Sequence, residues 1–291
     1  METAGIKIVI NSDQKITYAD RIYCFASDFD VSAADITYEI RTERFSLPGN
    51  AVAVHECEAY DLHADDDFFY YCFYLRDRLI KADIVVRRRR DSAAFFEMFV
   101  SPGYERWLYD GFLADEFMAI GDTLLFFDAV LLHASFVSWS GCGEKKGIIF
   151  SAPSGGGKST AASLWEKHEG AQVINGDRTI IRRVGGKFEG FGSTFAGSSN
   201  IYKNEGAPAS AIVILRQSPE NRAVRLEPAA AFKFIYSQTA LNRGYAGFIP
   251  GMMDIVEDIA KNVPVFMLEC RADKDAVETL KKELINPEQK N

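Results

Sequence analysis

The stretch "GIIFSAPSGGGKSTAASLWEKH", residues 147–168, decides how the second half of this 291-residue chain folds. Its apolar start, residues 147–150, predicts a buried strand, and residues 158–168 contain neither Pro nor Gly and predict a helix. Between them lies a glycine-rich segment whose backbone N–H groups, with the first turn of the helix, are suited to phosphate oxygens. Strand, glycine loop and helix in this order are the context that a phosphate-binding loop requires.

The usual pattern of such a loop is G-x-x-x-x-G-K-[ST], and this chain follows it except that Ala152 replaces the first glycine. In this interpretation Lys158 reaches the β and γ phosphates and the Ser159 hydroxyl binds Mg²⁺. The alternative is a glycine-rich surface turn that happens to contain Lys-Ser. The predicted nucleotide-binding residues are Ser154, Gly155, Gly156, Gly157, Lys158, Ser159 and Thr160.

Charge and cysteine content exclude several classes of protein. The chain has 33 Lys and Arg against 41 Asp and Glu, a net charge of −8, so nucleic acid is not an expected partner. Its five cysteines are scattered and form no C-x-x-C pair, which argues against a disulfide framework and a zinc knuckle and favours the reducing cytosol. The chain has no signal-peptide pattern and no apolar run of about 18 residues, so we expect a soluble, cytoplasmic protein without a membrane partner.

Residues 1–115 predict a small, mostly antiparallel β domain, because short segments rich in aromatic and β-branched residues alternate with turn signals such as "LPGN" and "SPGY". This domain contains no recognisable catalytic motif. Its run of four arginines, residues 87–90, could dock an acidic peptide or a phosphate. Because side chains alternate along a strand, only two of the four share a face, which favours a hairpin end with exposed arginines.

Residues 116–291 predict an α/β domain, in which strands and helices alternate. Apolar residues at spacings of three and four in "DEFMAIGDTLLFFDAVLL", residues 115–132, predict a buried helix leading into the next strand. The stretch at residues 273–285 predicts a terminal helix. The chain is therefore expected to contain two domains, with the boundary between residues 115 and 116.

Two residues near the glycine loop narrow the function. His133 lies 25 residues before Lys158 in "LLHASFV", and Asp177 lies 19 residues after it in "INGDRT". The base-recognition signature N-K-x-D of G proteins is absent. In these motifs, taken in order, residues 119–291 resemble the HPr kinase and phosphoenolpyruvate carboxykinase superfamily, most closely its HPr-kinase-related serine kinase subgroup of bacteria. The segments "GSTFAGSSNIYKNEGAP" and "AIVILRQSPENR" also look like this subgroup.

The resemblance implies a kinase domain that transfers phosphate from ATP, with Mg²⁺, to a hydroxyl group. It implies that Asp177 is the base toward the acceptor or a metal ligand, although the HPr kinases have two adjacent acids where this chain has Gly-Asp. His133 matches a histidine near that aspartate and the reacting phosphate; its alternative is a core histidine. Arg178 either neutralises developing charge or pairs with a surface acid. Glu205 is a candidate second metal contact.

The acceptor implied is a serine of a peptide or small protein, which the β domain would help to recognise. HPr itself is not expected, since residues 1–115 do not look like the N-terminal half of the HPr kinases. Two alternatives remain open: a kinase of a small molecule such as free serine or a sugar, and a regulatory module that binds nucleotide without phosphoryl transfer. The loop at residues 188–200, with Thr194, is either a mobile loop over the site or a plain connection. An oligomer is possible.

Overall fold

The computed structural model describes residues 1–15, 20–56, 60–75, 81–108, 118, 120–141, 143–195, 197–240 and 246–285. The chain divides into two compact units, Met1–Phe126 with Asn242–Ile249, and Phe127–Leu241 with Pro250–Asn291. The boundary predicted between residues 115 and 116 lies outside the described residues. No helix among the described residues is long and apolar enough to cross a membrane.

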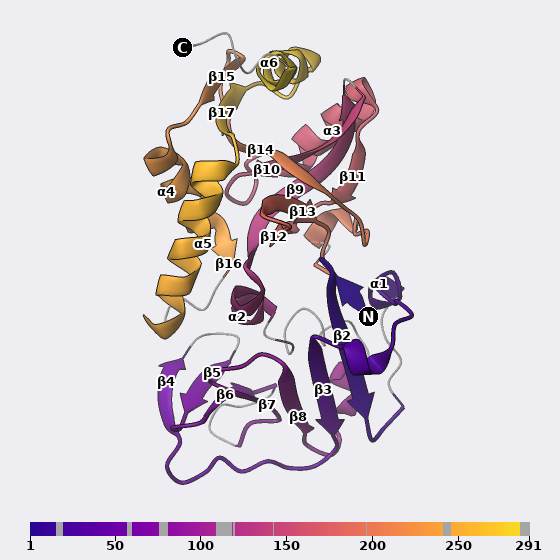
Figure 1. Cartoon of the computed structure of the whole chain (residues 1–291), viewed down its shortest axis with the longest axis vertical. Coiled ribbons are helices and arrows are strands. Elements are labelled where there is room, and N and C mark those ends of the chain that lie inside the picture. Colours follow the sequence, from indigo (N-terminus) through magenta and orange to yellow (C-terminus); the bar gives the residue numbers. More distant parts are fainter. Residues whose placement is uncertain are drawn as a thin grey trace. The chain divides into compact units, whose positions relative to one another are not determined.

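The first unit contains an eight-stranded sheet with the order β1-β2-β3-β8-β7-β6-β5-β4 (Figure 1). The β2–β3 and β3–β8 pairs are parallel and the other neighbouring pairs are antiparallel. The sheet is therefore mostly antiparallel, as the sequence predicts. Its strands are β1 (Glu2–Thr3), β2 (Ile6–Ser12), β3 (Ile36–Arg41), β4 (Val52–Glu56), β5 (Asp61–Ala64), β6 (Phe68–Phe73), β7 (Ile84–Arg89) and β8 (Phe95–Val100). Short helices are α1 (Asp20–Tyr23), η1 (Val31–Ala33), η2 (Glu105–Leu108) and η6 (Ala246–Phe248).

The arginine run corrects one expectation, because its members are not all exposed. Arg88, in β7, is buried, with 1% of its surface exposed. Its guanidinium carbon lies 5.0 Å from the ring centre of Phe69, 5.2 Å from that of Phe126 and 5.6 Å from that of Phe248. The aromatic faces attract the cation and fill the space around it, which is why the alternating strand can turn one arginine inward.

The second unit is an α/β fold around a nine-stranded sheet with the path β10-β9-β12-β13-β14-β17-β15. Since β10 also pairs with β14, the first five strands of this path close into a ring. The strands β10, β14 and β17 are parallel, so their carboxyl ends meet at one edge. The strands are β9 (Ala129–Gly141), β10 (Glu144–Ser151), β11 (Gln172–Asn175), β12 (Arg178–Val184), β13 (Lys187–Phe191), β14 (Gly206–Gln217), β15 (Arg222–Arg225), β16 (Thr239–Ala240) and β17 (Val265–Cys270).

Helices lie beside this sheet in the second unit (Figure 1). The helices are α3 (Lys158–Glu169), η5 (Gly197–Ser199), α4 (Pro228–Gln238), α5 (Ile249–Asn262) and α6 (Lys274–Ile285). One core cluster joins α3 and α6 to the sheet: Trp165 of α3 and Leu280 of α6 are buried with Phe150 of β10 and Val213 of β14. The predicted strand before the glycine loop, the helix after it and the terminal helix are therefore confirmed as β10, α3 and α6.

The helix predicted for residues 115–132 is wrong over its last part. The described residues form only the short helices α2 (Ile120–Thr123) and η4 (Leu124–Phe127), and β9 begins at Ala129. Asp128 between them has a φ of 50°, which a continuing helix does not allow. Residues 129–132 are apolar on both faces because β9 is buried, and a short apolar run of this kind fits a helix as well as a strand. Residues 115–117 and 119 lie outside the described residues.

Candidate active site

The glycine loop, residues 152–157, joins β10 to α3 through a tight turn. Gly157 precedes the helix with a φ of 97°, in the left-handed region that glycine adopts without strain, and offers the helix no side-chain cap. A side-chain carbon on Gly156 would come within 2.6 Å of the Ala152 side chain, so the turn also needs glycine for space. The first amides of α3 have no partner within the helix by geometry and are suited to an anion.

His133 lies where β9 changes partners on both of its edges. On one edge β9 pairs with β16 at residues 131–132 and with β10 from residue 134 onward. On the other edge it pairs with β12 up to residue 133, opposite Arg178, and with β11 from residue 136. The β9 pairing with β12 therefore ends at His133, and the pairing with β10 begins at the next residue.

Asn175, at the end of β11, fixes the backbone that carries Asp177. Its side-chain oxygen accepts hydrogen bonds from the backbone N–H groups of Asp177 (2.9 Å) and Arg178 (2.8 Å). Its side-chain nitrogen donates to the carbonyl oxygens of Ser193 and Phe195, at 3.0 Å each. The Asn175 side chain is fully buried, and this single amide ties the Asp177 turn to the loop that follows β13.

The Asp177 carboxylate lies between a histidine and an arginine. Its Oδ1 is 3.5 Å from His133 Nε2, and its Oδ2 is 3.7 Å from Arg178 Nε. These side chains are partly open to solvent, with exposed fractions of 30% for His133, 29% for Asp177 and 41% for Arg178. Arg178 stacks on Phe195, its guanidinium carbon 4.9 Å from the ring centre. The arrangement groups a partly exposed carboxylate, imidazole and guanidinium.

Lys158, the first residue of α3, is 8% exposed, and its Nζ donates to the Ala152 carbonyl at 3.3 Å. Burial lowers the pKa of Lys158 below its usual value, and the negative charge of Asp177 partly opposes that shift. The contact of the Lys158 amino group that is established is therefore with the backbone of its own loop.

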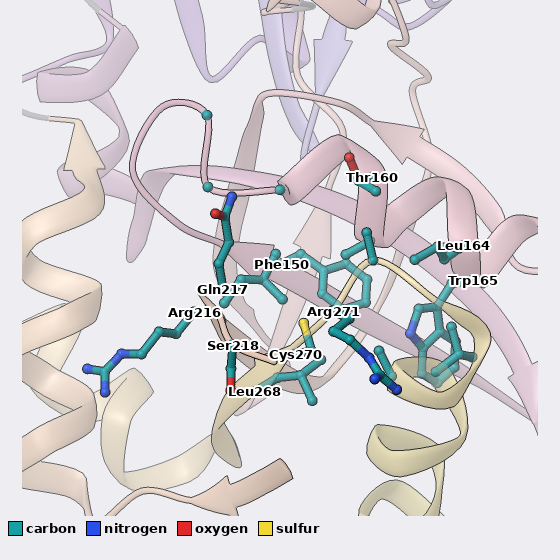
Figure 2. A pocket seen from close by; sticks show the side chains of 18 of the residues that line it. Phe150, Thr160, Leu164, Trp165, Arg216, Gln217, Ser218, Leu268, Cys270 and Arg271 are labelled. Atoms are coloured by element: carbon teal, nitrogen blue, oxygen red, sulfur yellow. The ribbon is translucent and has the colours of Figure 1, made fainter. Parts of the chain in front are cut away.

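An apolar pocket of about 530 Å³ opens beside the glycine loop, at the carboxyl ends of β10, β14 and β17 (Figure 2). Its walls carry Phe150 and Trp165, and its rim carries Gln217 and Arg271. Figure 2 shows the Gln217 side chain extending toward the glycine loop. Arg271 donates from Nε to Asp273 Oδ2 at 2.8 Å, and is thereby held at the rim. Gly155, Gly156, Gly157 and Thr160 line the same pocket.

Other residues predicted for the site have different surroundings. The Glu205 carboxylate accepts a hydrogen bond from Gln172 Nε2 at 3.0 Å, and Gln172 is at the end of β11 remote from Asp177. Thr194 is buried, and its hydroxyl oxygen has no partner among the described residues. In the described part of the chain, no three or more His, Cys, Asp and Glu side chains are grouped to hold a metal ion. The metal role of Ser159, Asp177 and Glu205 stays a prediction.

Sequence reasoning missed Asn175 as the support of Asp177, and it missed Gln238, whose Oε1 lies 3.3 Å from His133 Nδ1. Asn175 had a sequence signal, because it directly precedes the Gly-Asp-Arg segment at the end of a strand. Gln238 is 105 residues from His133 in the chain, and no pattern in the sequence links the two.

Comparison with known proteins adds little to this site. No protein-family model matches the chain, and no curated protein matches it. The chain has a likeness to the solved structure of the HPr(Ser) kinase/phosphatase from Coxiella burnetii, at 10% sequence identity and a TM-score of 0.30. That match covers 54% of this chain and 93% of the other. A TM-score this low carries no argument about shared fold or function, so the function is argued from the site.

Proposed function

We propose that this chain is a kinase that transfers the γ-phosphate of Mg-ATP to a serine hydroxyl of a peptide or small protein. The observation that carries the proposal is the Asp177 carboxylate, which lies between His133 and Arg178 in the same unit as the glycine loop and Lys158, the first residue of α3. Phosphoryl transfer to an alcohol needs a proton acceptor, positive charge near the transferring group and donors for the phosphates, and these residues and the glycine loop can supply all three.

The residues present fit a nucleoside triphosphate. The glycine loop and the first amides of α3 supply donors for phosphate oxygens, and Lys158 supplies a positive charge among them. The adjoining pocket, at about 530 Å³, is within the range of small-molecule sites, and its apolar walls suit a flat base. Phosphates on the loop and a base in the pocket would occupy two parts of one continuous site.

The residues also fit a magnesium ion that arrives with the phosphates. Mg²⁺ is commonly held by one or two protein oxygens together with phosphate oxygens and water, so a protein cluster of three ligands is not required. The Ser159 hydroxyl at the loop and the Asp177 carboxylate are the oxygens proposed for it. The bound ion supplies charge neutralisation on the phosphates.

The chain's own residues are assigned two tasks, accepting the hydroxyl proton and offsetting the charge of the transferring phosphate. The acceptor oxygen bonds to the γ-phosphorus as the bond to the β-phosphate oxygen breaks, and the hydroxyl proton passes to the Asp177 carboxylate. Arg178, held by Phe195, and Lys158 offset the negative charge on the transferring group. His133 contacts the Asp177 oxygen nearest to it and accepts or returns a proton there.

The peptide acceptor rests on the sequence resemblance of residues 119–291. The partial exposure of His133, Asp177 and Arg178 is compatible with it, because a polypeptide segment needs an open approach to the reacting atoms. A small-molecule acceptor and a nucleotide-binding regulatory module are the outcomes against which the proposal is tested.

The test is transfer of γ-labelled phosphate from Mg-ATP by the purified full chain in an extract of its native host, read on a gel and by chromatography of small molecules. Asp177→Asn is expected to lower transfer by roughly 10²–10⁴-fold, the range of proton-transfer contributions, while ATP binding is retained. Asp66→Asn, in an exposed turn of the first unit, is the matched control and is expected to behave as wild type.

The outcomes separate the alternatives. A labelled polypeptide that depends on Asp177 supports the proposal and provides the substrate to identify. Label that appears only in a metabolite overturns the peptide acceptor and moves the reaction to small molecules. ATP binding without any transfer, or transfer that Asp177→Asn leaves unchanged, overturns the proposed role of Asp177.

A further inference from the structure

The strand β15 ends the sheet of the second unit and pairs only with β17 among the described strands (Figure 1). The two strands are antiparallel, and the Leu226 N–H, one residue past β15, continues their ladder to the Val265 carbonyl at 2.8 Å. Hydrogen-bonded pairs alternate along such a ladder, so Val224 repeats the inward pairing of Leu226. The backbone N–H and carbonyl groups of Ala223 and Arg225 therefore face away from β17, toward an edge that no described strand covers.

A groove of about 830 Å³ runs along this edge. All four residues of β15 line it, together with Ser210 in the first half of β14 and Val265 at the start of β17. The glycine loop follows the carboxyl end of β10, which is parallel to β14 and β17, so the groove lies toward the other end of these strands. It shares no lining residue with the pocket beside the glycine loop.

Cations outnumber carboxylates along the groove, although the whole chain has a net charge of −8. The cations are Lys146, Arg222, Arg225 and Lys261, and the carboxylates are Glu227 and Glu283. Among the described residues, neither arginine side chain has a hydrogen bond or an ion pair. Glu269, directly opposite Arg222 on β17, is bound instead by Arg216 at 3.2 Å. The groove therefore offers two unpaired guanidinium groups beside unpaired backbone groups.

An extended segment with carboxylates would satisfy both kinds of group. Side chains alternate along a strand, so Arg222 and Arg225 project to opposite faces of β15. Ala223, on the same face as Arg225, packs against the core beneath α3 and α6. An added strand would thus meet one arginine on each face. A second copy paired through the same edge would bring arginines together, which is unfavourable, and a small anion would leave the backbone groups unpaired.

We propose that the edge of β15 binds an extended acidic segment of a partner polypeptide as an additional strand. Ala223 and Arg225 supply the backbone hydrogen bonds, and Arg222 and Arg225 pair with the carboxylates of the segment. Val224, which is 38% exposed, provides an apolar contact between the two arginines. The inference does not rest on the proposed kinase function, because none of these residues belongs to the Asp177 site or the glycine loop.

The first experiment measures fluorescence anisotropy of a short labelled peptide that alternates glutamate and valine, mixed with the full chain in the absence of nucleotide. The same peptide with lysine in place of glutamate is expected not to bind. Joint substitution Arg222→Glu and Arg225→Glu is expected to weaken binding of the acidic peptide by roughly tenfold or more, because like charges would then face each other. Lys187→Glu, at an exposed position of β13 in the same unit, is the control and should bind as wild type.

A second experiment tests the backbone pairing. Two further acidic peptides carry N-methyl groups on alternate amides, one on each of the two alternate sets. In an added strand one set faces β15 and the other faces away, so only one of the two peptides should lose binding. Hydrogen exchange of the Ala223 and Arg225 amides should slow when the unmodified peptide binds, whereas the Val224 amide, already paired with β17, should change little.

Several results would overturn the inference. These are failure of the acidic peptide to bind, equal binding of the lysine peptide, and unchanged binding to the double arginine variant. Binding that tolerates both methylated peptides would indicate a simple anion site and would exclude strand addition. Sedimentation of a wild-type dimer that the double variant does not form would assign the edge to a second copy. Since binding is read without ATP, failure of the kinase proposal and failure of this inference are distinguishable.

Discussion

The Arg88 cluster of the first unit and the Asp177 site of the second unit both combine an arginine, an aspartate and aromatic rings, but they differ in how far these side chains are exposed to solvent. In the first, Arg88 is enclosed by Phe69, Phe126 and Phe248, and Tyr71 beside it donates to Asp122 Oδ2 at 3.2 Å. Burial raises the pKa of Tyr71, and the Asp122 carboxylate raises it further, so the hydroxyl stays a donor. All of these polar side chains are buried.

In the Asp177 site of the second unit, only the Phe195 ring stacks on Arg178 among the described residues, and the side chain of Asp177 is 29% exposed. The distances of 3.5 Å and 3.7 Å around Asp177 are longer than good hydrogen bonds, which leaves its lone pairs available to a further partner. The difference teaches that an arginine and a carboxylate near aromatic rings stabilise the fold when they are buried. When they stay partly exposed, a ligand can reach them.

The comparison predicts the largest effect on stability at Arg88. Arg88→Ala is expected to lower the free energy of unfolding of the first unit by about 3 kcal/mol, because three ring contacts are lost and a cavity remains. Urea denaturation measures the loss, and hydrogen exchange of the β7 amides assigns it to the first unit. The neighbouring Arg89, paired with Asp91 on the surface, is the control, and Arg89→Ala is expected to unfold as wild type. Equal behaviour of the two variants would break the comparison.

Asn175 tests whether the open site is nonetheless rigidly supported. Asn175→Ala is expected to cost about 2 kcal/mol or more, because two backbone donors and two carbonyl acceptors lose a buried partner. Phosphate transfer should fall with it, since the Asp177 backbone is no longer fixed. Denaturation and transfer assays at a temperature where the variant is folded measure both. Asn11→Ala, which removes one exposed hydrogen bond to Glu39, should change neither quantity.

Substitution of Gly197 separates the effect of backbone strain from the effect of a contact with Asp177. Its φ is 55°, and a side-chain carbon there would lie 2.6 Å from Asp177 Cβ and Cγ. Gly197→Ala is expected to cost about 1–2 kcal/mol of left-handed backbone strain and also to displace the Asp177 carboxylate, which lowers kcat. Gly185 has the same φ of 55° with nothing within 4 Å, so Gly185→Ala carries the strain alone. If the two variants lose activity equally, the contact with Asp177 has no functional weight.

The sequence predicted those parts of the fold that depend on local pattern. The apolar residues 147–150 and the helix-forming residues 158–168 appear as parts of β10 and α3, because both signals lie within about 20 consecutive residues. The helix expected at residues 129–132 failed because a strand buried on both faces has no period-two alternation to reveal it. The burial of Arg88 escaped notice since Phe126 and Phe248 approach it from distant parts of the chain.

The same limit applies to the candidate site. Motifs with their order along the chain select His133, Lys158 and Asp177, and the contact of His133 with Asp177 depends on where β9 changes partners and where β11 ends. The supports of these residues depend on strand register, as with Gln238 beside His133, and register follows from pairings between segments far apart in sequence. The roles of all these residues remain predictions until transfer is measured.

The smallest expected effect is a proton linkage at Lys158. Burial lowers the pKa of Lys158 below its usual 10.5, so just below that pH the folded state binds fewer protons than the unfolded state. The free energy of unfolding of wild type should therefore rise with pH in this window relative to Lys158→Met, which has no proton to lose.

Triphosphate beside the Lys158 amino group would reverse the shift of its pKa, and ATP binding should then take up a proton in the same pH window. Calorimetry of binding in two buffers of different ionisation enthalpy measures that uptake. Binding without proton uptake in wild type would show that the Lys158 amino group does not contact the phosphates. Lys158 would then be a structural cation, as Arg88 is, and its proposed role in the site would be wrong.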